Sequence, residues 1–436
     1  MNEISLQITD PVPVYIAPVN EATAKWGVYC IPRMWRMPSG ELVIRAGGEE
    51  DSCLVESMQK APNLYFISND NGTSWEAVPS GEALFDYGSL LGIDSPYVRR
   101  QGGSCIAIRE KDDRKPIERL TPLKTFKLPN GEAIVHSYRY GDIPPECKGF
   151  DVLYFQDGSR IPKIRNAQIL FPEREILVNA LAWAGGEDYV PVPQYLRPYI
   201  FKDPYLACIK ELTDGTLIAV AFGQHPDVVD DSCGIIYLLA SQDGGITWEK
   251  RGIIAEDTKE LPYGYGGDGY ETTLTVAENG DLLCVMRMDM SVNPLYDNSP
   301  WDTMLAISHD NGYTWEKPVS VADSSVTPHI EALKDGIVFL AYGRPGVHCK
   351  ISCDNGKTWS NPYPIIGKCL EQERAEGRSD LESKYYDTCS YSNLFVEKIS
   401  DDSVLVLYTD LKYDPGDGLH HKAGLVRKIT VTKNTH

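Results

Sequence analysis

Short alternating runs of hydrophobic and polar residues recur along the whole 436-residue chain. A turn dipeptide followed by an apolar run occurs six times, as SGELVIRA at Ser39, NGEAIVHS at Asn130, DGTLIAVA at Asp214, NGDLLCVM at Asn279, DGIVFLAY at Asp335 and DDSVLVLY at Asp401. Alternating runs bounded by Gly, Asn and Asp are typical of β-strands joined by tight turns. The pattern therefore predicts an all-β chain in which helix is scarce.

A second pattern, S-x-D-x-G-x-[TS]-W, occurs at 68–75, 241–248, 308–315 and 352–359. In such a turn the Asp can accept hydrogen bonds from backbone N–H groups of its own hairpin, and the Gly can adopt a positive φ. The Trp can pack between sheets. We therefore interpret the motif as structural, and we expect its aspartates, Asp70, Asp243, Asp310 and Asp354, to take no part in chemistry.

The two patterns interlock into four-stranded antiparallel meanders, and six such units around an axis make a β-propeller. The prediction is a single domain over residues 1–436, a six-bladed β-propeller of four-stranded antiparallel blades. The approximate blades are 26–80, 118–165, 203–252, 270–320, 327–363 and 389–432. We expect the long connections 81–117 and 166–202 to rim a binding face, and the strand near Val12 to Ile16 to close the ring against the last blade.

The chain carries 42 Lys and Arg against 62 Asp and Glu, a formal net charge of −20. This excess argues against nucleic acid or an anionic membrane as the main partner, because both require a basic surface. No apolar run is long enough to span a bilayer, and the amino terminus has no signal-peptide pattern, so we expect a cytoplasmic protein. The 11 cysteines include no C-x-x-C pair, which predicts reduced thiols and no zinc site.

The S-x-D-x-G-x-T-W turns resemble the Asp-boxes of the sialidase (neuraminidase) superfamily, and the resemblance extends over nearly the full chain. Asp-boxes bear on the fold more than on the activity, so other segments must carry the function. In YETTLTVAENGDLLCVMR, Glu271 lies nine residues before Gly280 and Arg287 seven residues after it. This spacing is similar to a sialidase segment that carries a catalytic Glu and a substrate-binding Arg.

Two further segments extend the resemblance. SYSNLFVEKISDDSVLVLY is similar to the segment with the nucleophilic tyrosine in a Tyr-Ser-x-Leu sequence, which implies that Tyr391 is the nucleophile. YCIPRMWRMPSGELVIR resembles the Tyr-Arg-Ile-Pro segment that opens the first blade, but here Cys30 replaces the arginine. That departure bears on the identity of the sugar more than on the fold.

The chemistry of such a site is specific. A phenol with a pKa of about 10 is a poor nucleophile unless a neighbouring carboxylate takes its proton. A neutral Tyr also avoids the repulsion that a carboxylate nucleophile would feel from an anionic sugar. The resemblance implies that Tyr391 attacks, that Glu271 is its base and that a carboxylate of the first blade is the acid. The loop of that blade offers Glu49, Glu50, Asp51 and Glu56, among which spacing does not decide, and we favour Asp51 by residue type.

Arginines bind the substrate carboxylate in sialidases, because a planar guanidinium offers parallel donors to two oxygens. Arg287 and Arg344 match this role. Arg33, Arg36 and Arg45 are the alternatives for the arginine missing at position 30, and we include Arg36 in the predicted substrate-binding set.

The leading hypothesis is a sialidase-like exo-glycosidase that releases a terminal, acidic sugar with retention and needs no cofactor or metal. A second hypothesis is another carbohydrate-active propeller enzyme, such as a uronate-directed hydrolase or lyase that uses His136 or His225. A third is a propeller that binds glycans without catalysis. His329 and His348 read as pocket or packing residues. The partner in each case is an oligosaccharide or glycoconjugate, and the sequence leaves the oligomeric state open.

Overall fold

The computed structural model describes residues 4–25, 27–37, 39–48, 61–79, 97–110, 124–128, 131–139, 145–147, 149–156, 158–159, 161–170, 175–179, 206–224, 234–256, 271–287, 302–323, 326–343, 346–368 and 394–433. In these ranges the helical elements are α1 (Glu21–Ala24) and the 3-10 turn η2 (Pro145–Cys147), and almost everything else regular is strand. The predicted all-β class is confirmed. Neither helical element has the length and apolar character to cross a membrane.

Three antiparallel sheets each consist of four strands that follow one another along the chain. They are β3 (Pro32–Arg36), β4 (Leu42–Ala46), β5 (Leu64–Ser68) and β6 (Glu76–Val78); β18 (Thr272–Val276), β19 (Leu282–Arg287), β20 (Thr303–Ser308) and β21 (Val319–Ala322); and β22 (Val326–Ala332), β23 (Val338–Gly343), β24 (Val347–Ser352) and β25 (Tyr363–Ile366). Each hairpin turn between the first two strands carries one of the turn dipeptides, which explains why the sequence pattern finds these units.

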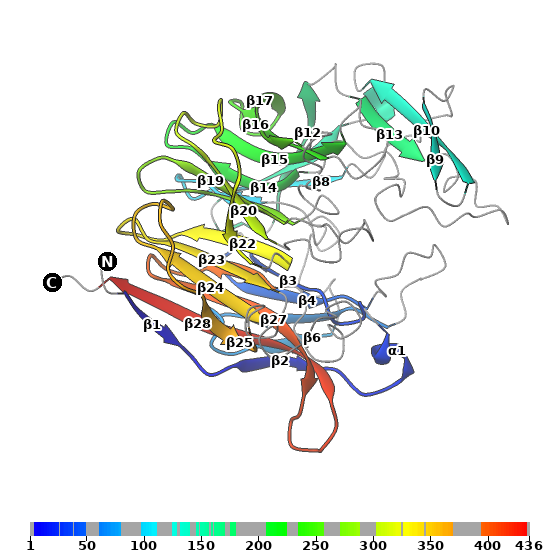
Figure 1. The fold of residues 1–436 in the computed structure, drawn as a ribbon. Helices are drawn as coiled ribbons and strands as arrows, with labels where there is room; N and C mark the ends of the chain where they lie inside the picture. Colours follow the sequence, from blue (N-terminus) through cyan, green and yellow to red (C-terminus); the bar gives the residue numbers. More distant parts are fainter. Residues whose placement is uncertain are drawn as a thin grey trace.

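A fourth sheet joins the two ends of the described chain. It contains β26 (Phe395–Lys398), β27 (Ser403–Tyr413), β28 (His421–Lys433), β1 (Ile4–Ile8) and β2 (Val12–Ile16). Both N-terminal strands pair antiparallel with β28, so the blue and red ends of the chain lie side by side in Figure 1. The expected pairing of the Val12 strand with the last unit is confirmed.

An eight-stranded sheet combines two antiparallel four-stranded units. One unit contains β7 (Tyr97–Arg99), β8 (Cys105–Glu110), β11 (Phe150–Phe155) and β12 (Lys163–Leu170), and the other β14 (Leu206–Glu211), β15 (Leu217–Gln224), β16 (Gly234–Ser241) and β17 (Thr247–Glu256). The outer strands β12 and β17 join the units through a short parallel pairing from Gln168–Thr247 to Leu170–Glu249.

The segment around NGEAIVHS differs from the expectation. We expected a four-stranded unit over 118–165, but β10 (Gly131–Arg139) pairs with β9 (Lys124–Leu128) on one side and β13 (Glu175–Asn179) on the other, in a separate three-stranded sheet. The four-stranded unit of this region begins at β7, inside the expected connection 81–117. The turn dipeptide correctly marks the β9–β10 hairpin, but a local pattern does not specify which third strand a hairpin will pair with.

The Asp-box turns are held by bonds within the motif. In the first, Ser68 Oγ donates to Asp70 Oδ1 at 2.8 Å and accepts the Gly72 N–H at 2.8 Å, while Asp70 Oδ1 also accepts the Ser74 N–H at 2.9 Å. The Ser74 hydroxyl donates to Asp70 Oδ2 at 2.6 Å, and this bond, followed by the others, lowers the pKa of Asp70 to about 2. Asn71 and Gly72 both have positive φ, 56° and 84°. The structural interpretation of the motif agrees with these contacts.

The hydrophobic core of the described residues is divided into clusters that lie between sheets. Each cluster takes buried side chains from two neighbouring units. Together the clusters join β2, β27 and β28 to β3–β5; β3 and β4 to β8 and β11; β7, β8, β11 and β12 to β14–β17; β15–β17 to β18–β20; β19–β21 to β22 and β23; and β23–β25 to β26–β28. The first strands of the units also contact one another, in the order β3, β26, β22, β18, β14 and β7. Burial between sheets therefore holds the units together.

Candidate functional site

The hairpin β18–β19 brings two of the predicted site residues together. Glu271 directly precedes β18 and Arg287 ends β19, and the Arg287 N–H donates to the Glu271 carbonyl at 3.1 Å. Their side chains form an ion pair with 2.7 Å between Arg287 Nη1 and Glu271 Oε1. Residues that flank a hairpin symmetrically lie opposite each other across the ladder, so the sequence spacing and the contact have one cause.

The second carboxylate oxygen of Glu271 binds the neighbouring sheet. Glu271 Oε2 accepts the backbone N–H of Thr327, on β22, at 2.7 Å. The side chains of Glu271 and Arg287 are 16% and 19% exposed, so both remain partly accessible. A carboxylate has about four lone-pair sites, so this one, fixed by a donor at each oxygen, can still accept a further proton or hydrogen bond.

Tyr391, Asp51 and Arg344 lie outside the described residues, and their assignments stay predictions. In sequence, Arg344 directly follows β23, Tyr391 lies three residues before Leu394 and Asp51 lies five residues after Ala46, where β4 ends. In an antiparallel hairpin the beginning of the first strand and the end of the second lie together, at the end opposite the turn. In sequence, Arg344 and Asp51 therefore follow a second strand, as Arg287 ends one, and Tyr391 precedes a first strand, as Glu271 does.

Arg36, the other arginine of the predicted substrate-binding set, contacts β26 and the first Asp-box turn. It ends the first strand β3, beside the Asp-box turn, where its guanidinium donates to Gly40 O at 2.8 Å and to Asn71 Oδ1 at 3.0 Å. It also pairs with Glu397 of β26, with 3.3 Å between Nε and Oε1. Glu271 lies at the beginning of its first strand, so Arg36 occupies the opposite strand end, among contacts that stabilise the sheets.

The position that differs from the sialidase pattern is a buried thiol. Cys30 is 0% exposed and its Sγ donates to the Val28 carbonyl at 3.5 Å. None of the cysteines that the structure describes forms a disulfide. Arg33 lies three residues further along, near the beginning of β3, whereas Arg36 ends that strand. Arg33 is therefore the arginine of β3 whose place in its strand corresponds to that of Glu271, which precedes β18.

Two of the histidines singled out in the sequence are held neutral. Burial, with the charges of Arg33 and Lys210 adding to it, lowers the pKa of His329 to about 3, and its ring lies 4.7 Å from that of Phe395. Burial lowers the pKa of His348 to about 4. Both features fit pocket or packing residues. The side chain of His136 and all of His225 lie outside the part described.

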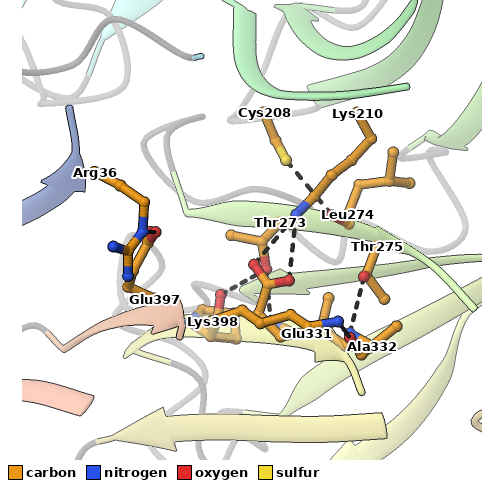
Figure 2. A network of polar contacts seen from close by, with 12 residues as sticks. Arg36, Cys208, Lys210, Thr273, Leu274, Thr275, Glu331, Ala332, Glu397 and Lys398 are labelled. Atoms are coloured by element: carbon orange, nitrogen blue, oxygen red, sulfur yellow. Dashed lines mark hydrogen bonds and ion pairs between the residues drawn. The ribbon is translucent and has the colours of Figure 1, made fainter. Parts of the chain in front are cut away.

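Sequence reasoning missed a polar network between the first strands, which Figure 2 shows. Lys210 of β14 pairs with Glu331 of β22, with 3.2 Å between Nζ and Oε1, and Lys398 of β26 donates to the Ala332 carbonyl at 2.9 Å. Burial disfavours the charge of Lys210, but the Glu331 carboxylate, with further contributions from Cys208 and Glu397, outweighs burial and raises the pKa of Lys210. Lys210 and Glu331 are 121 residues apart in sequence, and no local motif signals their contact.

Among the described side chains, no three His, Cys, Asp or Glu residues gather in a metal-binding cluster. A cavity of about 580 Å³ lies between the α1 segment and the β27–β28 hairpin. Its lining includes Asn20, Thr23 and Lys422, and none of the predicted site residues. These polar groups already bind the protein, since Asn20 and Thr23 cap α1 and Lys422 donates to the Val28 carbonyl at 3.1 Å.

Comparison with known proteins gives one family match, in which residues 306–317 match the BNR/Asp-box repeat. No curated protein matches the chain. Among solved structures, a protein of unknown function from Dyadobacter fermentans is similar at 18% identity, over 97% of this chain and 99% of that one, with a TM-score of 0.56. This similarity shows a common fold.

Two glycosidase structures are more distant. The Hadza microbial sialidase Hz136 has 14% identity over 94% of this chain and 66% of its own, with a TM-score of 0.48. An α-L-arabinofuranosidase from Fusarium graminearum has 13% identity over 96% of this chain and 98% of its own, with a TM-score of 0.45.

Proposed function

We propose that the protein is a sialidase-like exo-glycosidase that removes a terminal, acidic sugar from an oligosaccharide or glycoconjugate with retention of configuration. The observation that carries this proposal is the Glu271–Arg287 ion pair at the beginning of β18 and the end of β19. The sequence resemblance assigns a catalytic base and a substrate-binding arginine to these two positions, and the ion pair shows that both side chains lie at the same end of the β18–β19 hairpin. The site therefore has a carboxylate and a cation side by side, still partly accessible.

We propose further that the fold is a six-bladed β-propeller. Six core clusters among the described residues each connect two neighbouring units, and followed from unit to unit they return to the first. The pairing of β1 and β2 with β28 completes the last unit with strands from the N-terminal end. Radial repetition of this kind leaves short, protected sheet edges, and it surrounds an axis where the ends of the first strands converge.

In the proposed mechanism Tyr391 attacks the anomeric carbon and Glu271 accepts the phenol proton. The glycosyl–tyrosine bond forms as the bond to the leaving oxygen breaks, and Asp51 gives that oxygen a proton. Asp51 then takes a proton from water, which attacks the anomeric carbon and releases the tyrosine, and the phenol recovers its proton from Glu271. Two displacements at one carbon give retention.

Arg287 has two roles in this proposal. Its Nη1 orients Glu271 through the ion pair, and together with Arg344 its guanidinium binds the carboxylate of the sugar. Arg offers five donors in a fixed fork, so a single arginine can bind two carboxylates at once. The strand arrangement supports this assignment, since Arg344 directly follows β23 as Arg287 ends β19.

The test is release of a fluorescent aglycone from an aryl α-sialoside by the wild type, Tyr391→Phe and Glu271→Gln. The matched controls are Tyr313→Phe, at a tyrosine that is 61% exposed, and Glu249→Gln, at an exposed position of β17. Turnover that both site substitutions reduce by about 10³-fold or more, and that both controls retain, is the expected result. A folded wild type without turnover, or a Tyr391→Phe variant with full turnover, contradicts the proposal.

A further inference from the structure

Thr327 has an unusual backbone conformation. Its φ is 44°, in the left-handed region, where a β-branched residue is a genuine outlier. It also precedes Pro328, and a residue before proline normally adopts an extended conformation. The pairing of β22 with β23 changes register between Val326 and His329, so Thr327 lies at an irregularity in the ladder. Such an outlier persists only when its surroundings hold it.

The conformation lets Thr327 contact two other sheets. Its N–H donates to Glu271 Oε2 at 2.7 Å, and its Oγ1 accepts the N–H of Leu394 at 2.9 Å. Thr327 is 5% exposed and its bond to Leu394 is buried, whereas its bond to Glu271 is partly buried. One side chain and its own backbone amide thus connect the carboxylate that precedes β18 to the segment that leads into β26.

The hydroxyl contact by itself is ordinary in this protein. Thr273 Oγ1 accepts the Ile330 N–H at 3.1 Å, and Thr275 Oγ1 accepts the Ala332 N–H at 3.0 Å. Both threonines lie on β18, in regular register with β19, and Figure 2 shows them facing β22. Threonine hydroxyls therefore satisfy edge amides between sheets as a general device. What distinguishes Thr327 is the positive φ, which turns its own amide to Glu271.

We propose that Thr327 is a positioning residue of the catalytic site, which holds the Glu271 carboxylate in register with the segment that carries Tyr391. The inference rests on the proposed function, in which Glu271 accepts the Tyr391 proton. Tyr391 precedes Leu394 by three residues, so the Thr327 hydroxyl binds the backbone close to the nucleophile in sequence. Proton transfer requires hydrogen-bond reach, and a displacement of about 1 Å can reduce a rate by about 10²-fold.

The kinetic test compares Thr327→Val, Thr327→Ser and Thr275→Val on the aryl α-sialoside. Thr327→Val keeps the shape and removes the acceptor for Leu394, whereas Thr327→Ser keeps the acceptor. We expect Thr327→Val to lower kcat by about 10- to 100-fold while KM changes less than about twofold. Thr327→Ser should keep kcat within about threefold of wild type. Thr275→Val removes an equivalent inter-sheet bond and should leave kcat unchanged while lowering Tm.

Equal loss of kcat in Thr327→Val and Thr275→Val, or wild-type kcat in Thr327→Val, overturns the inference. Crystal structures of Thr327→Val and Thr327→Ser provide a readout that does not depend on the substrate. Glu271 should shift relative to Leu394 in the Val variant and stay in place in the Ser variant. If Glu271 does not move in the Val variant, the positioning role is refuted, whether or not the wild type cleaves sialosides. If the wild type does not cleave sialosides, only the proposed function is refuted.

Discussion

Lys210 on β14 forms an ion pair with Glu331 on β22, with 3.2 Å between Nζ and Oε1 (Figure 2). A third strand, β18, contacts both β14 and β22. The pair therefore links two sheets that belong to different core clusters. The side chains are 25% and 20% exposed, and burial disfavours the charge of Lys210. A partly buried pair of this kind stabilises the arrangement only while both partners are present.

Removing one member of this pair should destabilise the protein more than removing both. Lys210→Met leaves Glu331 without its cation, and breaking a buried pair costs about 3–5 kcal/mol. The residual exposure places the expected loss near the lower end of that range. The double variant Lys210→Met with Glu331→Met should recover a large part of it. Urea unfolding measures each free energy, with Lys357→Met at an exposed lysine as control. Equal losses in the single and double variants would contradict this account.

A glycine-to-alanine pair tests the contact of an Asp-box with its neighbouring sheet. Gly312 (φ 91°) and Gly280 (φ 89°) share a backbone conformation that costs alanine about 1–2 kcal/mol. A Cβ on Gly280 meets nothing within 4 Å, whereas one on Gly312 would overlap the buried Leu238 side chain. Gly312→Ala should therefore lose about 1–3 kcal/mol more than Gly280→Ala, measured by urea unfolding. Equal losses of stability in Gly312→Ala and Gly280→Ala would mean that Gly312 is not closely packed against Leu238.

Acid should destabilise the protein through His348. Its pKa is about 4 when folded, below its ordinary value of 6.5, because the ring is buried, and neither ring nitrogen has a hydrogen-bond partner among the described residues. Above pH 6.5 both states are neutral and the group has no effect. Between pH 6.5 and 4 the unfolded state binds the proton more tightly, so stability falls by up to about 3 kcal/mol.

The matched variant for this prediction is His348→Leu, which removes the titrating group and leaves no buried acceptor unpaired. Its free energy of unfolding should depend less on pH between 6.5 and 4 than that of the wild type. At pH 7 its stability should be close to that of the wild type, because the imidazole makes no hydrogen bond there. A pH dependence unchanged by the substitution would assign the acid sensitivity to other groups.

His421 should respond to pH in the opposite direction. Its Nδ1 lies 2.8 Å from the Ala17 carbonyl and its Nε2 2.8 Å from Asp417 Oδ2. Both partners accept hydrogen bonds, so only the imidazolium satisfies both. These bonds, that to Ala17 first, raise the pKa of His421. The contact that joins the β27–β28 hairpin to the segment after β2 is therefore complete below pH 6.5 and is lost as pH rises through the raised pKa.

An NMR titration of the imidazole measures this effect directly. Asp417→Asn should lower the pKa of His421 towards its ordinary value, while an equivalent change at the distant Asp302 should not. Hydrogen exchange near Ala17 should accelerate in the wild type above the pKa of His421. A pKa of His421 at or below 6.5 in the wild type would be incompatible with the two acceptor contacts.

The sequence by itself determined the features that depend on neighbours in the chain. Alternation and turn dipeptides predicted the strands, because the side-chain period of a strand and the chemistry of a tight turn are local. The Asp-box bonds, such as Ser68 to Asp70, close within a few residues. Glu271 and Arg287 could be paired from sequence because one hairpin lies between them, and its ladder fixes their register.

Tertiary structure alone decided the contacts between sheets. Nothing in the sequence near Thr327 indicates a positive φ, because the partners that hold it, Glu271 and Leu394, lie 56 and 67 residues away. The pairing of Arg36 with Glu397 likewise depends on the packing of β3 against β26. The third strand of the β9–β10 hairpin was equally beyond local reasoning. A strand edge offers the same N–H and C=O groups to any partner, so packing selects which partner it binds.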